Sequence, residues 1–162
     1  MNMNPVLHST FAIDRNYPVA PSRVFAAFAN GATKRRWFSP GNGTEVLEFT
    51  LDFRVGGREQ SRYRFEGGPA GAPAGGTEFG NDTTYQDIVP DRRIVFAYTM
   101  TMADKRISAS LGTVELVPEG KGTRLTYTEQ AAFLDGGDGP QMREKGWRGL
   151  LQNLDDELRR SA

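Results

Sequence analysis

The stretch QMREKGWRGLLQNLDDELRRSA, residues 141–162, decides the fold. Its large apolar residues recur at intervals of three and four, which predicts an amphipathic helix with one apolar stripe; they are Trp147, Leu150, Leu151, Leu154 and Leu158. A single helix with one stripe needs one apolar surface to cover, and a curved antiparallel sheet provides it. Gly146 and Gly149 are poor helix formers, and we expect them to allow close approach to the element that the helix crosses.

The sequence before this helix supplies such a sheet. Apolar and polar residues alternate in six segments that are mostly joined by short turns, which predicts an antiparallel meander; the segments are 44–53, 58–67, 77–90, 93–102, 106–118 and 122–133. An earlier strand is predicted within 9–19, followed by a short helix from Pro21 to Asn30 and a second within 32–40. The expected fold is therefore α+β, with a sheet of about six or seven strands, two short helices after the first strand and a long C-terminal helix.

Two segments are expected to be flexible. Residues 67–76, GGPAGAPAGG, contain only glycine, proline and alanine, which favours a mobile hairpin tip over a lid on a ligand. Residues 1–8 are expected to form a tail. The rest of the 162 residues is one domain of ordinary size.

Composition excludes several classes of function. Twenty basic and twenty acidic side chains cancel, so no overall field attracts nucleic acid or an anionic membrane. No apolar run approaches the ~20 residues of a membrane span, so no membrane insertion is expected. The N-terminus lacks the basic and apolar regions of a signal peptide, and the chain has no cysteine. A cytoplasmic protein is the default expectation.

The sequence offers few groups for metal or nucleophilic chemistry. His8 is the only histidine and falls in the expected tail, which argues against a Ser-His-Asp triad and a histidine metal site. Residues 134–140, LDGGDGP, lack the acidic spacing of a calcium loop and are predicted to form a turn. We expect no metal and no cofactor.

Five stretches, in order along the chain, resemble the START-like (birch-pollen-allergen-like, SRPBCC) superfamily, and specifically the bacterial homologues of the heat-shock-protein-90 ATPase activator. They are YPVAPSRVFAAFANGATKRRWF (17–38), LDFRVGGREQSRYRF (51–65), YQDIVPDRRIVFAY (85–98), GTRLTYTEQAAF (122–133) and GWRGLLQNLDDEL (146–158). The resemblance implies a helix-grip fold, in which the sheet holds the C-terminal helix over an apolar cavity. The Gly/Pro/Ala insert at 67–76 departs from the family beside the cavity mouth.

The resemblance implies a small hydrophobic or amphipathic ligand. Aromatic rings would stack on it and tyrosine hydroxyls would orient it. The residues expected to line the ligand site are Trp37, Phe53, Tyr85, Phe96, Tyr98, Met100, Tyr127, Trp147 and Leu151.

Glu129 is the best candidate for any proton chemistry. It shares a strand face with the apolar Leu125, Tyr127 and Ala131, so an unbroken strand points it inward. A carboxyl group buried there would favour its protonated form, which suits a general acid or base. Alternatively, the strand bulges at this point, or Glu129 pairs with a cross-strand arginine.

Asp52 is the second candidate. It is out of phase with Leu51 and Phe53, so it faces solvent if these two residues build the core and lines the cavity in the opposite phase. The arginines of 51–65, Arg62 and Arg64 above all, are expected on a solvated outer face of the sheet.

Three functions compete on this evidence. Ligand binding leads. An enzyme of the cyclase or dehydratase type, using Glu129 or Asp52 with a tyrosine, is the alternative. A chaperone-activating interaction module is the third, and it ranks lower because the chain does not show the extra N-terminal domain of the eukaryotic activators. An edge strand would also allow a homodimer.

Overall fold

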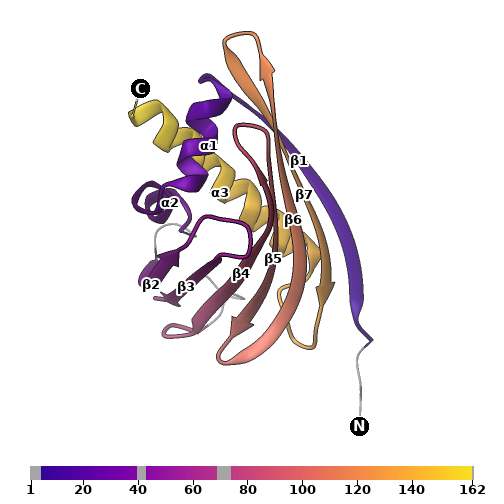
Figure 1. Cartoon of the computed structure of the whole chain (residues 1–162). Coiled ribbons are helices and arrows are strands. Elements are labelled where there is room, and N and C mark those ends of the chain that lie inside the picture. Colours follow the sequence, from indigo (N-terminus) through magenta and orange to yellow (C-terminus); the bar gives the residue numbers. More distant parts are fainter. Residues whose placement is uncertain (1–4, 40–42, 69–73, 162) are drawn as a thin grey trace.

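The computed structural model describes residues 5–39, 43–68 and 74–161. Seven strands form one sheet, and three helices lie against one of its faces (Figure 1). In chain order the elements are β1 (Leu7–Tyr17), α1 (Pro21–Ala29), α2 (Gly31–Trp37), β2 (Thr44–Leu51), β3 (Arg58–Phe65), β4 (Glu78–Val89), β5 (Arg93–Met102), β6 (Lys105–Glu119), β7 (Gly122–Phe133) and α3 (Pro140–Arg160).

The sheet is antiparallel throughout and follows the order β1-β7-β6-β5-β4-β3-β2. From β2 to β7 each strand pairs with the next, as a meander requires. Strand β1 then pairs with β7, so the first and last strands of the chain are neighbours. The α+β fold with a curved sheet and a long C-terminal helix is confirmed.

The N-terminal prediction is wrong at its boundary. Strand β1 begins at Leu7, and His8 pairs with Ala132 of β7 instead of lying in a tail. Its side chain is exposed. Residues 1–4 lie outside the described residues, as do residues 69–73 of the expected flexible loop at 67–76.

The two short helices follow from local capping. Pro21 occupies the first turn of α1, where its missing N–H costs nothing. Asn30 ends α1 and caps α2, because its side-chain oxygen accepts a hydrogen bond from the Thr33 amide at 3.0 Å. This shared residue turns the chain abruptly and places Trp37 in the core.

Helix α3 crosses the concave side of the sheet (Figure 1). The predicted apolar stripe faces inward: Trp147, Leu151, Leu154 and Leu158 are buried, and Leu150 is partly buried. Gly146 and Gly149 are exposed, and apart from the adjacent residues and the helix's own backbone no described atom lies within 4 Å of the place that a Cβ would take. The expectation that these glycines allow a close approach is therefore wrong; they lie on the solvent side of the helix. No described helix is both long and apolar enough to cross a membrane.

Candidate functional site

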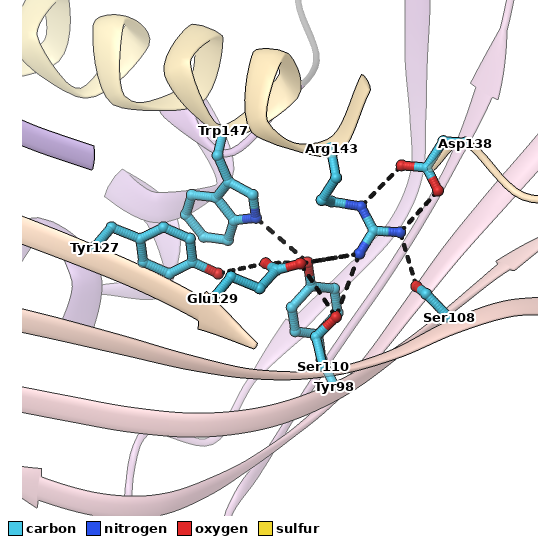
Figure 2. A network of polar contacts seen from close by, with 8 residues as sticks. All are labelled: Tyr98, Ser108, Ser110, Tyr127, Glu129, Asp138, Arg143 and Trp147. Atoms are coloured by element: carbon cyan, nitrogen blue, oxygen red, sulfur yellow. Dashed lines mark hydrogen bonds and ion pairs between the residues drawn. The ribbon is translucent and has the colours of Figure 1, made fainter. Parts of the chain in front are cut away.

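Glu129 is fully buried on the concave face of β7 (Figure 2). The hydroxyls of Tyr98 and Tyr127 each donate to its Oε1 at 2.6 Å. On the other oxygen, Oε2, Ser110 Oγ donates at 3.1 Å and Arg143 Nη1 at 3.2 Å. Three hydroxyl donors and one cation therefore surround the two carboxylate oxygens.

Arg143 is the cation of this network, and it comes from the first turn of α3. Asp138 holds the guanidinium from the other side in a two-pronged pair, at 2.9 Å to Nε and 3.0 Å to Nη2. Ser108 Oγ accepts from Nη2 at 2.7 Å. Burial alone would lower the pKa of Arg143, but Tyr98, Asp138 and Glu129 together raise it. The arginine therefore stays charged although it is buried.

The phase argument for Glu129 is confirmed, because its side chain points to the concave face and its register with β1 and β6 shows no bulge. Glu129 does pair with an arginine, as one alternative predicted, but this arginine belongs to helix α3 and not to a neighbouring strand. Arg143 was not among the predicted site residues, although it lies four residues before Trp147 and thus on the same helix stripe.

A second buried ion pair lies under α2. Lys34 Nζ donates to Glu59 Oε1 of β3 at 2.6 Å, and the Tyr85 hydroxyl donates to the same oxygen at 2.6 Å. Lys34 and Glu59 are only 5% and 2% exposed. Lys34 Nζ also lies 4.5 Å from the centre of the Phe38 ring, which is close enough for a cation–π interaction. Neither Lys34 nor Glu59 was among the predicted site residues.

The aromatic residues near the middle of α3 fill the space between helix and sheet. The Trp147 ring stacks on Tyr127 with centres 3.9 Å apart, and Trp147 Nε1 donates to the Tyr98 hydroxyl at 3.3 Å. Phe96 packs against both aromatic rings. This part of the concave face is closely packed core.

Away from this core, the concave face of strands β2 to β5 is less well covered by other parts of the chain. On this part of the concave face Phe49, Tyr63, Phe79 and Met100 are only partly buried. The Tyr63 and Phe79 rings stack nearly in parallel, with centres 5.5 Å apart and 11° between their planes. Burial raises the pKa of Tyr63. The charge of Arg143 lowers this pKa and the charge of Asp138 raises it, so both groups lie close enough to Tyr63 to act on it. This surface therefore adjoins the start of α3.

Two polar side chains lie within this surface without partners. Ser61 and Asn81 face each other across β3 and β4, and Met100 and Phe49 flank them on β5 and β2. Among the described residues, neither Ser61 Oγ nor Asn81 Oδ1 has a hydrogen-bond partner, and both atoms are buried. A buried polar atom without a partner typically costs about 1–3 kcal/mol.

The residues predicted to line a ligand site fall into three groups. Trp37 packs against Phe28 and donates from Nε1 to the Ala27 carbonyl at 2.9 Å, so it belongs to the core with Tyr85, Phe96, Tyr127 and Leu151. Tyr98 and Trp147 are buried at the edge of the less covered surface. Met100 and Phe53 are partly buried, and Phe53 packs against Phe25 and Tyr85.

Asp52 lies at the surface rather than in the interior. Its carboxylate accepts from Arg54 Nε at 2.8 Å, and both side chains are more than half exposed. Arg58 and Arg62 are also exposed and Arg64 is partly exposed, and all three pair with carboxylates on neighbouring strands. The solvated outer face expected for these arginines is confirmed, and Asp52 is excluded from the buried network.

Two hollows of the surface lie away from α3. One, of about 130 Å³, lies around Gly80, and Ser61, Phe79 and Asn81 are among the residues that line it. The other, of about 550 Å³, lies between the start of α1 and the end of β6. Within residues 5–39, 43–68 and 74–161, no three histidine, cysteine or acidic side chains are grouped so that they could hold a metal ion.

A curved antiparallel sheet that grips a long C-terminal helix defines a protein of the START-like superfamily, whose members often bind hydrophobic ligands. The model of one family within it, described as activator of Hsp90 ATPase homolog 1-like protein, matches residues 18–159. The chain belongs to this family.

Solved structures agree with this assignment. The protein Mll3558 from Rhizobium loti is 54% identical, covers 95% of this chain and 99% of its own, and superposes with a TM-score of 0.81. A putative uncharacterized protein from Rhizobium leguminosarum is 37% identical, with 96% and 97% covered and a TM-score of 0.85. An AHSA1-like protein from Aeromonas hydrophila shares the fold at 19% identity and a TM-score of 0.69. No curated protein is significantly similar to the chain.

Proposed function

We propose that the protein binds a small amphipathic molecule on the concave face of β2–β5, beside the start of α3. The observation that carries this proposal is the combination of partly buried apolar side chains with two buried, unpartnered polar atoms. Concave apolar surfaces with a few convergent polar groups are typical ligand sites. The surface is defined by Phe49, Ser61, Tyr63, Phe79, Asn81 and Met100, and is called the β3–β4 surface below.

The site lies nearer the β2 edge of the sheet than the predicted lining residues suggested. The stacked Tyr127 and Trp147 rings occupy the space under the middle of α3, so a ligand there would have to displace the core. Met100, Tyr98 and Trp147 connect this core to the β3–β4 surface. These three are the predicted ligand contacts that we retain.

The geometry supports binding better than catalysis. Tyr98, Tyr127, Ser110 and Arg143 already bond to both oxygens of Glu129, and the side chain is fully buried, so a substrate finds no free carboxylate oxygen there. A buried pair of this kind acts first on stability, since breaking it removes charge-assisted hydrogen bonds that are shielded from water. We assign Glu129 the role of fixing α3 to the sheet beside the binding surface.

The proposal is tested with the neutral fluorescent probe N-phenyl-1-naphthylamine. We expect saturable binding of one molecule per chain. Met100→Trp places a large ring on the β3–β4 surface and should abolish the signal. Leu111→Trp is the matched control, because Leu111 is 37% exposed on the outer face of β6 and its replacement should leave binding unchanged. A folded protein without saturable binding, or equal binding by both variants, would contradict the proposal.

A further inference from the structure

Ser61 and Asn81 form a polar pair whose hydrogen bonds are incomplete. Ser61 is 4% exposed and directly opposite Asn81 in the β3–β4 register. In the part of the chain that the structure describes, no group bonds to Ser61 Oγ or to the Asn81 amide oxygen. Folded proteins pair nearly all such atoms with protein groups, ordered water or a ligand. A hydroxyl and an amide together can both donate and accept, so they complement a head group that does the same.

The charges around this pair argue against an ionised head group. The buried cations nearby, Lys34 and Arg143, are already paired with Glu59 and with Glu129 and Asp138. These groups include one more carboxylate than cation. A ligand carboxylate or phosphate would therefore lose its hydration without gaining a free cation, which is costly in a buried site.

The neighbouring side chains suit a flat apolar body. Tyr63 lies two residues after Ser61, and Phe79 lies two residues before Asn81, so all four share the concave face. The near-parallel Tyr63 and Phe79 rings line it beside the polar pair. Aromatic rings of this kind offer large contact areas to planar ligands.

We infer that the ligand is an uncharged planar molecule whose hydroxyl or amide head group bonds to Ser61 and Asn81. This inference rests on the proposed function and adds the chemical class of the ligand. The pair selects the ligand because only a neutral head group that both donates and accepts completes its hydrogen bonds without burying a new charge.

Three probes that differ only in their head group test the inference: naphthalene, 2-naphthol and 2-naphthoate, at pH 7. Each is titrated against protein loaded with N-phenyl-1-naphthylamine. We expect 2-naphthol to displace this reporter at about tenfold lower concentration than either of the others, as one or two hydrogen bonds to otherwise unpaired groups allow.

Asn81→Leu should bring 2-naphthol to the level of naphthalene and leave naphthalene itself unchanged. Gln60→Leu is the matched control, because this amide lies on the opposite, outer face of β3 and bonds to Asp82. Ser61→Ala should also weaken 2-naphthol, and it keeps the test available if Asn81→Leu fails to fold.

Two results separate failure of this inference from failure of the proposed function. If the reporter binds but the three probes compete equally, or 2-naphthoate competes best, the neutral head group is wrong and the binding site stands. If the reporter itself does not bind, the proposed function fails and this inference fails with it.

Discussion

Glu129 of β7 and Arg143 of α3 form a buried ion pair, with 3.2 Å between Oε2 and Nη1. The pair joins the last strand to the first turn of the helix that the sheet grips. Tyr98 of β5 and Ser110 of β6 bond to both partners, so three adjacent strands and the helix meet at one carboxylate. This network fixes the start of α3 next to the β3–β4 surface.

Replacing Glu129 by glutamine should destabilise the protein. Glutamine removes one of the two carboxylates that pair with Arg143 and leaves Asp138 as the other, so the cost should lie near the lower end of the range for broken buried pairs, about 3 kcal/mol. Urea unfolding at pH 7 measures this free energy. Glu115→Gln is the control, because Glu115 is exposed on β6 and its loss should change stability by about 0.5 kcal/mol or less. Unchanged or increased stability of Glu129→Gln would mean that the carboxyl is an unpaired acid.

The protein should lose stability at alkaline pH. Burial raises the pKa of all five tyrosines, Tyr17, Tyr63, Tyr85, Tyr98 and Tyr127, above their ordinary value of about 10. The folded state therefore keeps phenol protons that the unfolded chain releases. Stability from these groups is complete below about pH 10 and falls as the pH rises above it.

Tyrosinate absorbance followed together with circular dichroism checks this expectation. The tyrosines should ionise with the loss of secondary structure, whereas the chain in denaturant should titrate near pH 10. A native circular dichroism spectrum with several tyrosines already ionised near pH 10 would refute it.

Lys34 and Glu59 should behave as a coupled pair. Lys34→Met leaves Glu59 as an uncompensated buried charge and should cost about 3–5 kcal/mol. Adding Glu59→Leu removes that charge, so most of the loss should be recovered, apart from about 1 kcal/mol for the Tyr85 hydroxyl that loses its acceptor. A double-mutant cycle in urea measures the coupling. Losses that simply add would show that the two side chains act independently.

Two glycine substitutions should have opposite effects. Gly146 faces solvent in the interior of α3, so Gly146→Ala should increase stability by about 1 kcal/mol through helix propensity. At Gly112 a Cβ would lie 2.6 Å from the Phe96 ring and 2.9 Å from the Tyr127 hydroxyl. Gly112→Ala should therefore cost about 1–3 kcal/mol. Thermal unfolding of the two variants compares them directly, and a stabilising Gly112→Ala would contradict the packing of Phe96 on Tyr127.

The fold was predictable because its signals are local. The stripe of α3 and the alternation in β7 place Leu151, Leu154, Tyr127 and Glu129 inside without knowledge of their partners. The exposed Gly146 and Gly149 show the limit of this reasoning, since a poor helix former need not serve a contact.

The charged part of the interior was less predictable because its partners are distant in sequence. Lys34 meets Glu59, which lies 25 residues away, and charged residues are rarely buried, so neither stood out. The Ser61–Asn81 pair depends on strand register, which the alternation alone did not give.

Chemical-shift mapping with 2-naphthol tests the binding site most directly. We predict saturable shifts of the backbone amides of Ser61, Asn81 and Met100 and of the Trp147 indole, and none at Leu111 on the outer face. Shifts confined to the hollow beside Pro21 and Val117, or no saturable shift, would contradict a ligand site on the concave face of the sheet.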